Sequence, residues 1–219
     1  MQHIARPGTR LRLLVAVAAI AGFMVVPAQG QAAFKFGSKL GTDVQPSNAE
    51  TAHFCRPANH AQSCTWVMNE AYGRPNGGHK APRAGMITKL RLIAGESGSF
   101  RLYIVKVRKT GPSRYEAKVV KKGPVIRYDG QPDPDEPYLV ESFNVHLGVK
   151  KGERLAIKTN KTSTLRCSSG GDNTLFYKPP LVLGAAFRRN TDDEGCWMLI
   201  EAVANPVSAR VGGSFRPAR

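Results

Sequence analysis

The stretch MITKLRLIAGESGSFRLYIVKV, residues 86–107, decides the fold class of this chain. Residues 86–94 are rich in Ile, Leu and Thr and alternate in the period-2 manner of a strand, and residues 100–107 are apolar at both odd and even positions. Turn-forming residues, Gly95–Gly98, separate the two runs. The stretch therefore predicts two β-strands joined as a hairpin. The second strand fits the centre of a sandwich, where both faces of a strand are buried.

Further short apolar runs follow the same pattern along the chain, and none shows a 3.6-residue period over eleven or more residues. Glycine- and proline-containing turns separate them at intervals of roughly 8–12 residues, which is typical of sandwiches and barrels. About nine short strands thus predict an all-β, antiparallel fold. The alternative is an α+β domain with a short helix near residues 69–72.

The first thirty residues have the composition of a secretory signal peptide. Arg6, Arg10 and Arg12 precede an apolar run at residues 13–26, and small residues follow at 27–33. The run is about 14 residues long, whereas a membrane-spanning helix needs roughly 20. We therefore expect a signal peptide at 1–30 and a protein that is secreted or bound to the cell surface, with no membrane span after cleavage. A retained membrane anchor is the alternative.

The remaining chain divides by composition into three parts. Residues 31–50 are mixed and polar and are expected to be a lead-in segment, and residues 51–205 carry the predicted strands. Residues 206–219 contain three arginines and no acid in a Gly-, Ser-, Ala- and Pro-rich context, which predicts a flexible basic tail.

Four cysteines in an exported chain predict two disulfide bonds. Of the three connectivities, Cys55–Cys64 and Cys167–Cys196 are preferred because each closes a short loop between segments expected to neighbour each other in a sheet. The alternative is a zinc site, because His53, Cys55, His60 and Cys64 lie close together. Their spacing lacks the paired pattern of structural zinc sites, so the disulfides are favoured.

Two stretches carry a resemblance to known families. FNVHLGVKKGERLAI, residues 143–157, is an alternating strand followed by Val-x-x-Gly-Glu and a second strand, and GMITKLRL, residues 85–92, places a glycine before a long strand. These features resemble jelly-roll domains of secreted bacterial proteins, among them carbohydrate-binding modules and galactose-binding-like domains. The layout of residues 50–205 is also similar to exported bacterial β-sandwich proteins of unknown function. The resemblance implies an antiparallel β-sandwich of jelly-roll type and places no catalytic residue.

The charge balance points to an anionic partner. The chain has 32 basic and 16 acidic residues, and three of the basic ones lie in residues 1–30, which leaves 29 basic residues in the exported part. Such an excess favours acidic envelope polymers, anionic lipid surfaces or nucleic acid, with solubility alone as the alternative. Lys106 and Arg108 are expected to lie opposite Lys118, which would make one sheet face cationic.

An acidic loop at residues 129–136 lies between two tyrosines, Tyr128 and Tyr138. Its carboxylates are of the kind that binds Ca²⁺, although the spacing is not that of a known calcium loop, so a solvated loop is favoured and no cofactor is expected. Exposed tyrosines stack on sugars, and we predict a binding face formed by Tyr128, Tyr138 and the neighbouring Arg127. Trp66 and Trp197 each lie near a cysteine and are expected in the core.

No pattern selects a catalytic group. The chain lacks a Gly-x-Ser-x-Gly elbow, His146 lies within a predicted strand, and no carboxylate pair is singled out for glycosidic chemistry. We therefore predict a secreted, non-catalytic binding protein for a glycan or acidic polymer. The alternatives are a sugar-polymer hydrolase or lyase on the same fold, and a protein that binds nucleic acid or other polyanions by charge alone.

Overall fold

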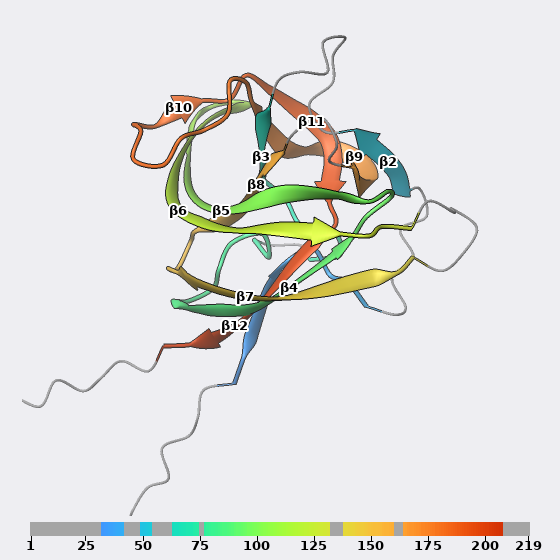
Figure 1. Cartoon of the computed structure of the whole chain (residues 1–219). Coiled ribbons are helices and arrows are strands. Elements are labelled where there is room, and N and C mark those ends of the chain that lie inside the picture. Colours follow the sequence, from blue (N-terminus) through green and yellow to red (C-terminus); the bar gives the residue numbers. More distant parts are fainter. Residues whose placement is uncertain are drawn as a thin grey trace, which may run out of the picture. The chain divides into compact units, whose positions relative to one another are not determined.

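The computed structural model describes residues 32–41, 49–53, 63–74, 77–131, 138–159 and 164–207 (Figure 1). These residues form twelve β-strands and no helix, which confirms the predicted all-β class. Accordingly, no helix capable of crossing a membrane occurs in the described ranges. The strands are β1 (Phe34–Gly37), β2 (Ala49–His53), β3 (Cys64–Met68), β4 (Gly85–Ile93), β5 (Gly98–Gly111), β6 (Arg114–Tyr128), β7 (Val140–Val149), β8 (Arg154–Thr159), β9 (Thr164–Tyr177), β10 (Arg188–Arg189), β11 (Asp192–Met198) and β12 (Ile200–Pro206).

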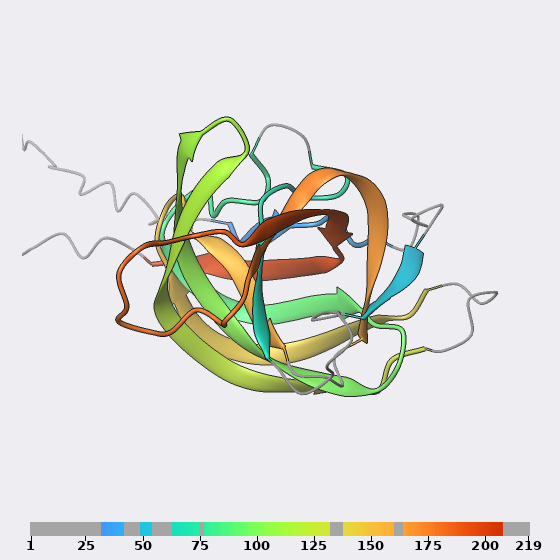
Figure 2. The ribbon, with the colours of Figure 1, turned by 90° about the horizontal axis from the view of Figure 1, so that it is seen from above.

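The strands are arranged in two sheets. The smaller sheet has the order β1-β12-β4-β7, and the larger has the order β10-β6-β5-β8-β3-β9-β11, with β2 paired to β9. Every pairing between these strands is antiparallel. Figure 1 shows β4, β7 and β12 beneath the long strands β5 and β6, and Figure 2 shows how strongly β5 and β6 bend.

Eight of the strands pair in a nested order. β1 pairs with β12, β3 with β8, β4 with β7, and β5 with β6, so each partner pair encloses the next one along the chain. The first and third pairs lie in the smaller sheet, and the second and fourth lie in the larger sheet. β9, β10 and β11 are inserted between β8 and β12, and they extend the larger sheet at both of its ends.

The main core contains side chains from both sheets. Phe36, Leu90 and Ile200 come from the smaller sheet, and Leu102 and Ile157 come from the larger sheet. A second apolar cluster includes Tyr103, Val105, Ala156, Tyr177 and Leu181. Neighbouring residues of β5 thus belong to different clusters, as expected from opposite faces of one strand. The prediction that residues 100–107 form a central strand is confirmed, and burial on both faces covers residues 102–105 of that strand.

The predicted hairpin between residues 86–94 and 100–107 is wrong, although both strands exist. β4 pairs with β12 and β7, whereas β5 pairs with β6 and β8. Residues 94–97 therefore carry the chain from one sheet to the other. Both edges of β5 are occupied by β6 and β8, so no edge is left for β4.

The pairing of β4 and β6 is irregular at two places. In β4, the registers with β12 and β7 shift between Ile87 and Lys89, so Ile87 on one side of the bulge and Leu90 on the other both reach the main core. In β6, the ladder with β5 continues past Pro124 through register shifts, so residues 114–128 form one strand. Proline is tolerated there because β10 pairs with β6 only at Glu116 and Ala117.

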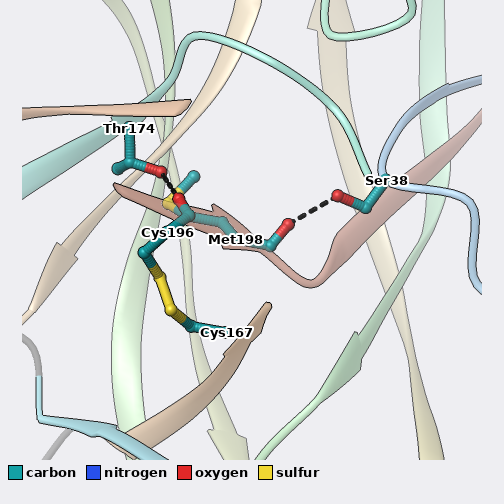
Figure 3. The surroundings of a disulfide bond; sticks show 5 residues. All are labelled: Ser38, Cys167, Thr174, Cys196 and Met198. Carbon is teal, nitrogen blue, oxygen red and sulfur yellow. Dashed lines mark hydrogen bonds between the residues drawn. A yellow bond between two sulfur atoms is a disulfide. The ribbon is translucent and has the colours of Figure 1, made fainter. Parts of the chain in front are cut away.

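The Cys167–Cys196 disulfide is confirmed and joins β9 to β11, which are neighbours in the larger sheet (Figure 3). The two Cα atoms are 5.5 Å apart. Thr174 Oγ1 also donates to the carbonyl oxygen of Cys196. Because β12 begins at Ile200, this bridge secures the point where the chain leaves the larger sheet for the smaller one.

Several predictions fall on residues outside the described ranges. These are the signal peptide at 1–30, most of the basic tail at 206–219, Cys55 with its bridge to Cys64, His60 of the alternative zinc set, and residues 132–136 of the acidic loop. Residues 31–219 form one compact unit distinct from residues 1–30. Strand pairing within this unit begins at β1, so the sheets start earlier than the expected boundary at residue 51.

Candidate functional site

A cleft of about 640 Å³ opens where three segments meet. Its lining comes from β1, from the loop between β3 and β4, and from the turn between β7 and β8. Four of the described lining residues are basic and none is acidic: Lys35, Arg74, Lys80 and Lys151. We call this feature the basic cleft. The positive electrostatic potential of these four side chains favours a negatively charged ligand.

A second hollow of about 440 Å³ adjoins the basic cleft and shares Arg74 and Gly77 with it. Trp197, His79 and Glu70 also line it. We call this feature the aromatic hollow. An indole ring beside a guanidinium group offers an apolar face and a charged donor next to each other, which suits ligands that combine a flat apolar face with an anionic group.

Backbone hydrogen bonds hold the loop between β3 and β4 against the sheets. Gly37 N donates to Gly78 O over 2.8 Å, which ties the loop to the end of β1, and Ala81 N donates to Glu153 O over 2.9 Å, which ties it to the turn before β8. Gly77, at the junction of the two hollows, has a φ of 90°, a conformation that glycine adopts without strain. These backbone hydrogen bonds thus hold the glycine-rich loop in place as a wall of the cleft.

Beneath the cleft, Glu201 accepts from two arginines. Its carboxylate lies 2.5 Å from Arg74 Nη2 and 2.6 Å from Arg91 Nη1, with Lys35 Nζ at 3.7 Å. Glu201 is 1% exposed, whereas the Arg74 side chain keeps 25% of its surface exposed. Three cations share one carboxylate, so the group keeps a net positive charge. Arg74 is held in place from below while part of its surface remains open to the cleft.

Ser38 positions the aromatic side of the site. Its buried hydroxyl donates to Met198 O over 2.7 Å and accepts from Tyr72 N over 3.1 Å (Figure 3 shows the first of these bonds). The ring of Tyr72 meets that of Trp197 edge-on, with centroids 5.8 Å apart. The backbone on either side of Trp197 is held by the disulfide at Cys196 and by the Ser38 bond at Met198, and its ring packs against Tyr72.

His79 contributes a neutral side chain to the site. Burial, followed by the positive charges of Arg154 and Lys80, lowers the pKa of His79 to about 3. Arg154 is itself buried and donates to Asn69 Oδ1 over 2.7 Å, and burial lowers its pKa to about 10. No carboxylate in the described part of the chain forms an ion pair with Arg154. Its charge therefore adds to the positive field around the cleft.

The side chains that line the two hollows are suited to binding an anion through basic groups. Among the described residues lining the two hollows, Glu70 is the sole carboxylate, and Glu201 is covered by its arginine partners. No group of three or more His, Cys, Asp or Glu side chains converges in the described ranges in the manner of a metal site. The arrangement supplies donors and positive charge for an anionic ligand.

The residues predicted to form a tyrosine face lie outside the two hollows, and one of them is buried. Tyr128 is 3% exposed and packs on Phe100 with ring centroids 5.9 Å apart, so its ring cannot stack on a ligand. Tyr138 is half-buried, with Arg166 over its ring at 4.9 Å. Arg127 is exposed on β6 opposite Ser99. None of the three predicted residues lines either hollow.

The predicted cationic pairing on β5 and β6 is correct for Lys106, which lies directly opposite Lys118. Arg108 instead lies opposite Glu116 and forms an ion pair with it at 2.5 Å. These residues also lie outside the two hollows.

Sequence reasoning missed the basic cleft and misplaced Trp197. Trp66 is buried as expected, but Trp197 lines the aromatic hollow. The available signals were the glycine-rich loop at 73–82 with Arg74 and Lys80, and the basic turn at Lys150–Gly152. No family model, curated protein or solved structure matches this chain.

Proposed function

We propose that this protein is a secreted, non-catalytic binding protein that holds an acidic polymer, in particular a carboxylate-bearing glycan, in the basic cleft. One observation carries the proposal: four basic side chains and no acidic one line a cleft of about 640 Å³. Pockets of roughly 300–1,000 Å³ hold small ligands, and both hollows fall in that range, so together they suit consecutive units of a polymer.

The aromatic hollow favours a glycan over a ligand recognised by charge alone. Sugar rings carry an apolar face that packs on aromatic side chains, and Trp197 lies beside Arg74, which can receive a carboxylate. We expect a uronic acid unit to stack on Trp197 while its carboxylate meets Arg74. Neighbouring acidic units of the same polymer would then meet Lys80 and Lys151.

We also infer that the fold is of jelly-roll type. The nested pairing of β1 with β12, β3 with β8, β4 with β7, and β5 with β6 supports this inference, because a jelly roll is a long hairpin rolled into two packed sheets. The alternation of these pairs between the two sheets supports it as well. The β9–β11 insertion would then be an addition particular to this chain.

Titration calorimetry with polygalacturonate, neutral dextran and single-stranded DNA, each at low and high salt, tests the proposed function. We expect K80E/K151E to lose polygalacturonate binding, and W197A to weaken polygalacturonate binding more than DNA binding. K122E/R127E makes the same charge change on exposed positions of β6 outside the hollows and should bind as the original protein does.

Three results would contradict the proposal. Equal loss in K80E/K151E and K122E/R127E would indicate that net charge and not the cleft binds. DNA binding as tight as polygalacturonate binding, with the same dependence on salt, would indicate a general polyanion binder. Release of new reducing ends from polygalacturonate during incubation would show that the protein is an enzyme.

A further inference from the structure

The loop between β9 and β10 exposes apolar side chains at its tip. Val182 is 62% exposed and Leu183 is 48% exposed, and Gly184, Ala185 and Ala186 are exposed as well. In Figure 2 this loop, drawn in orange, projects to the left of the strands. Adjacent exposed apolar side chains are a feature of surfaces that contact a protein or a membrane.

The loop is anchored firmly on both sides of its tip. Leu181 is buried in the second apolar cluster, and its backbone N donates to Thr65 Oγ1 over 3.0 Å. Leu183 forms an isolated parallel bridge with Val119, and Arg188 enters β10 opposite Ala117. The fold therefore presents Val182 and Leu183 outward from a fixed base.

Basic side chains lie on the strands that neighbour this loop. They lie at the far end of the β5–β6 hairpin and on β10, and we call them the basic rim: Lys106, Arg108, Lys109, Arg114, Lys118 and Arg189. Phe187 follows the tip and lies between two of them, with Arg108 at 4.4 Å and Lys118 at 4.8 Å from its ring.

The rim contains little opposing charge. Glu116 is the one acid within residues 106–118 and 181–190, and Arg108 already pairs with it. Asp192 and Asp193 follow on β11, which pairs with β9 and not with the hairpin. The basic rim therefore keeps an excess of positive charge next to an exposed apolar tip.

We propose that the tip at Val182–Leu183 and the basic rim dock this protein onto an anionic lipid surface. Peripheral proteins bind such surfaces by placing apolar side chains at the headgroup level while basic residues attract the anionic headgroups. A soluble polyanion would need the cations but not an exposed Val-Leu pair. The rim and tip share no lining residue with the basic cleft, so this inference is independent of the proposed polymer binding.

Sedimentation with vesicles tests the docking surface, using residues 31–219, which form one compact unit. One vesicle population is phosphatidylcholine alone, and the other contains equal amounts of phosphatidylcholine and phosphatidylglycerol. We expect binding to the anionic vesicles only. Each basic residue near such a surface contributes about fivefold in affinity, so K109E/R114E should weaken binding by at least about tenfold. V182S/L183S should weaken it about tenfold as well, because the apolar insertion is lost.

Matched variants separate the site from general effects. L139S removes another exposed apolar side chain, 56% exposed, and K122E/R127E reverses two exposed charges elsewhere on β6. Both should bind anionic vesicles as the original protein does, and thermal unfolding should show that all four variants are folded. Full binding by V182S/L183S would overturn the proposal, since charge alone would then suffice. Equal losses in the matched variants, or self-association through the tip without vesicle binding, would also overturn it.

Discussion

Replacing Glu201 by glutamine should lower stability and raise anion affinity at the same time. The carboxylate is 1% exposed and lies 2.5 Å from Arg74 and 2.6 Å from Arg91. Removing one partner of a buried ion pair costs about 3–5 kcal/mol. Both arginines retain some contact with solvent, so we expect a smaller loss, about 2–3 kcal/mol. In a domain of this size that corresponds to roughly 5–10 °C in Tm.

The gain in affinity follows from the position of Glu201 beneath Arg74. An anion on the open side of the Arg74 guanidinium would lie roughly 6–7 Å from the Glu201 carboxylate, where an effective dielectric constant of about 20 gives a repulsion of about 2.5 kcal/mol. Salt near physiological strength reduces this to about 1 kcal/mol. The E201Q variant should therefore bind polygalacturonate about fivefold more tightly than the original protein at temperatures where both are folded.

The matched control is E116Q, which breaks the ion pair between Glu116 and Arg108. That pair is exposed, with 58% of the Arg108 side chain accessible, so its loss should cost less than about 1 kcal/mol. Circular dichroism melts and titration calorimetry measure the two effects. An unchanged Tm for E201Q would refute the buried network as a source of stability. Weaker polygalacturonate binding by a folded E201Q protein would refute the placement of the anion at Arg74.

Three further predictions concern the supports of the site. S38A removes a buried hydroxyl that is bonded to Met198 O, so denaturant titration should show a loss of about 1–3 kcal/mol in unfolding free energy. The tryptophan emission spectrum should shift as well. An unchanged spectrum would contradict the role of Ser38 in positioning the aromatic hollow. The double variant C167A/C196A opens a loop of 29 residues, so its unfolding free energy in the same titration should be lower by about 3.5 kcal/mol. An unchanged unfolding free energy would argue against the bridge. His79 is neutral in the folded state down to its pKa of about 3, whereas in the unfolded chain it gains a proton below about 6.5. Stability should therefore fall as the pH decreases from 6.5 towards 3, and H79Q should lose that part of the pH dependence in melts at stepped pH.

Much of the fold class follows from local patterns in the chain. The double-faced apolar run at residues 100–107 predicted a central strand, and β5 is one, with its neighbours Leu102 and Tyr103 in different apolar clusters. The even set of cysteines predicted Cys167–Cys196, because the residues flank segments that become the neighbours β9 and β11. Both features depend on residue type: apolar β-branched and aromatic residues favour a strand, and cysteines can form a disulfide.

Partner choice between strands did not follow from the same patterns. Gly95–Gly98 is as suitable for a crossover between sheets as for a hairpin, so the pairing of β4 with β7 and β12 was missed. The burial of Tyr128 was missed for a related reason. The sequence does not show what packs over a tyrosine beside a loop, and the ring of Tyr128 is buried against Phe100.

The sequence by itself determined that this chain forms strands, because strand periodicity is a local property, and it favoured the Cys167–Cys196 bridge among three possible connectivities. Tertiary structure alone decided where a ligand would bind. Lys35, Arg74 and Lys151 lie far apart along the chain, and they meet because β1, the loop before β4 and the turn before β8 are brought together by long-range pairing. Each of these residues alone is an ordinary surface cation, and their common field exists only once the two sheets have packed.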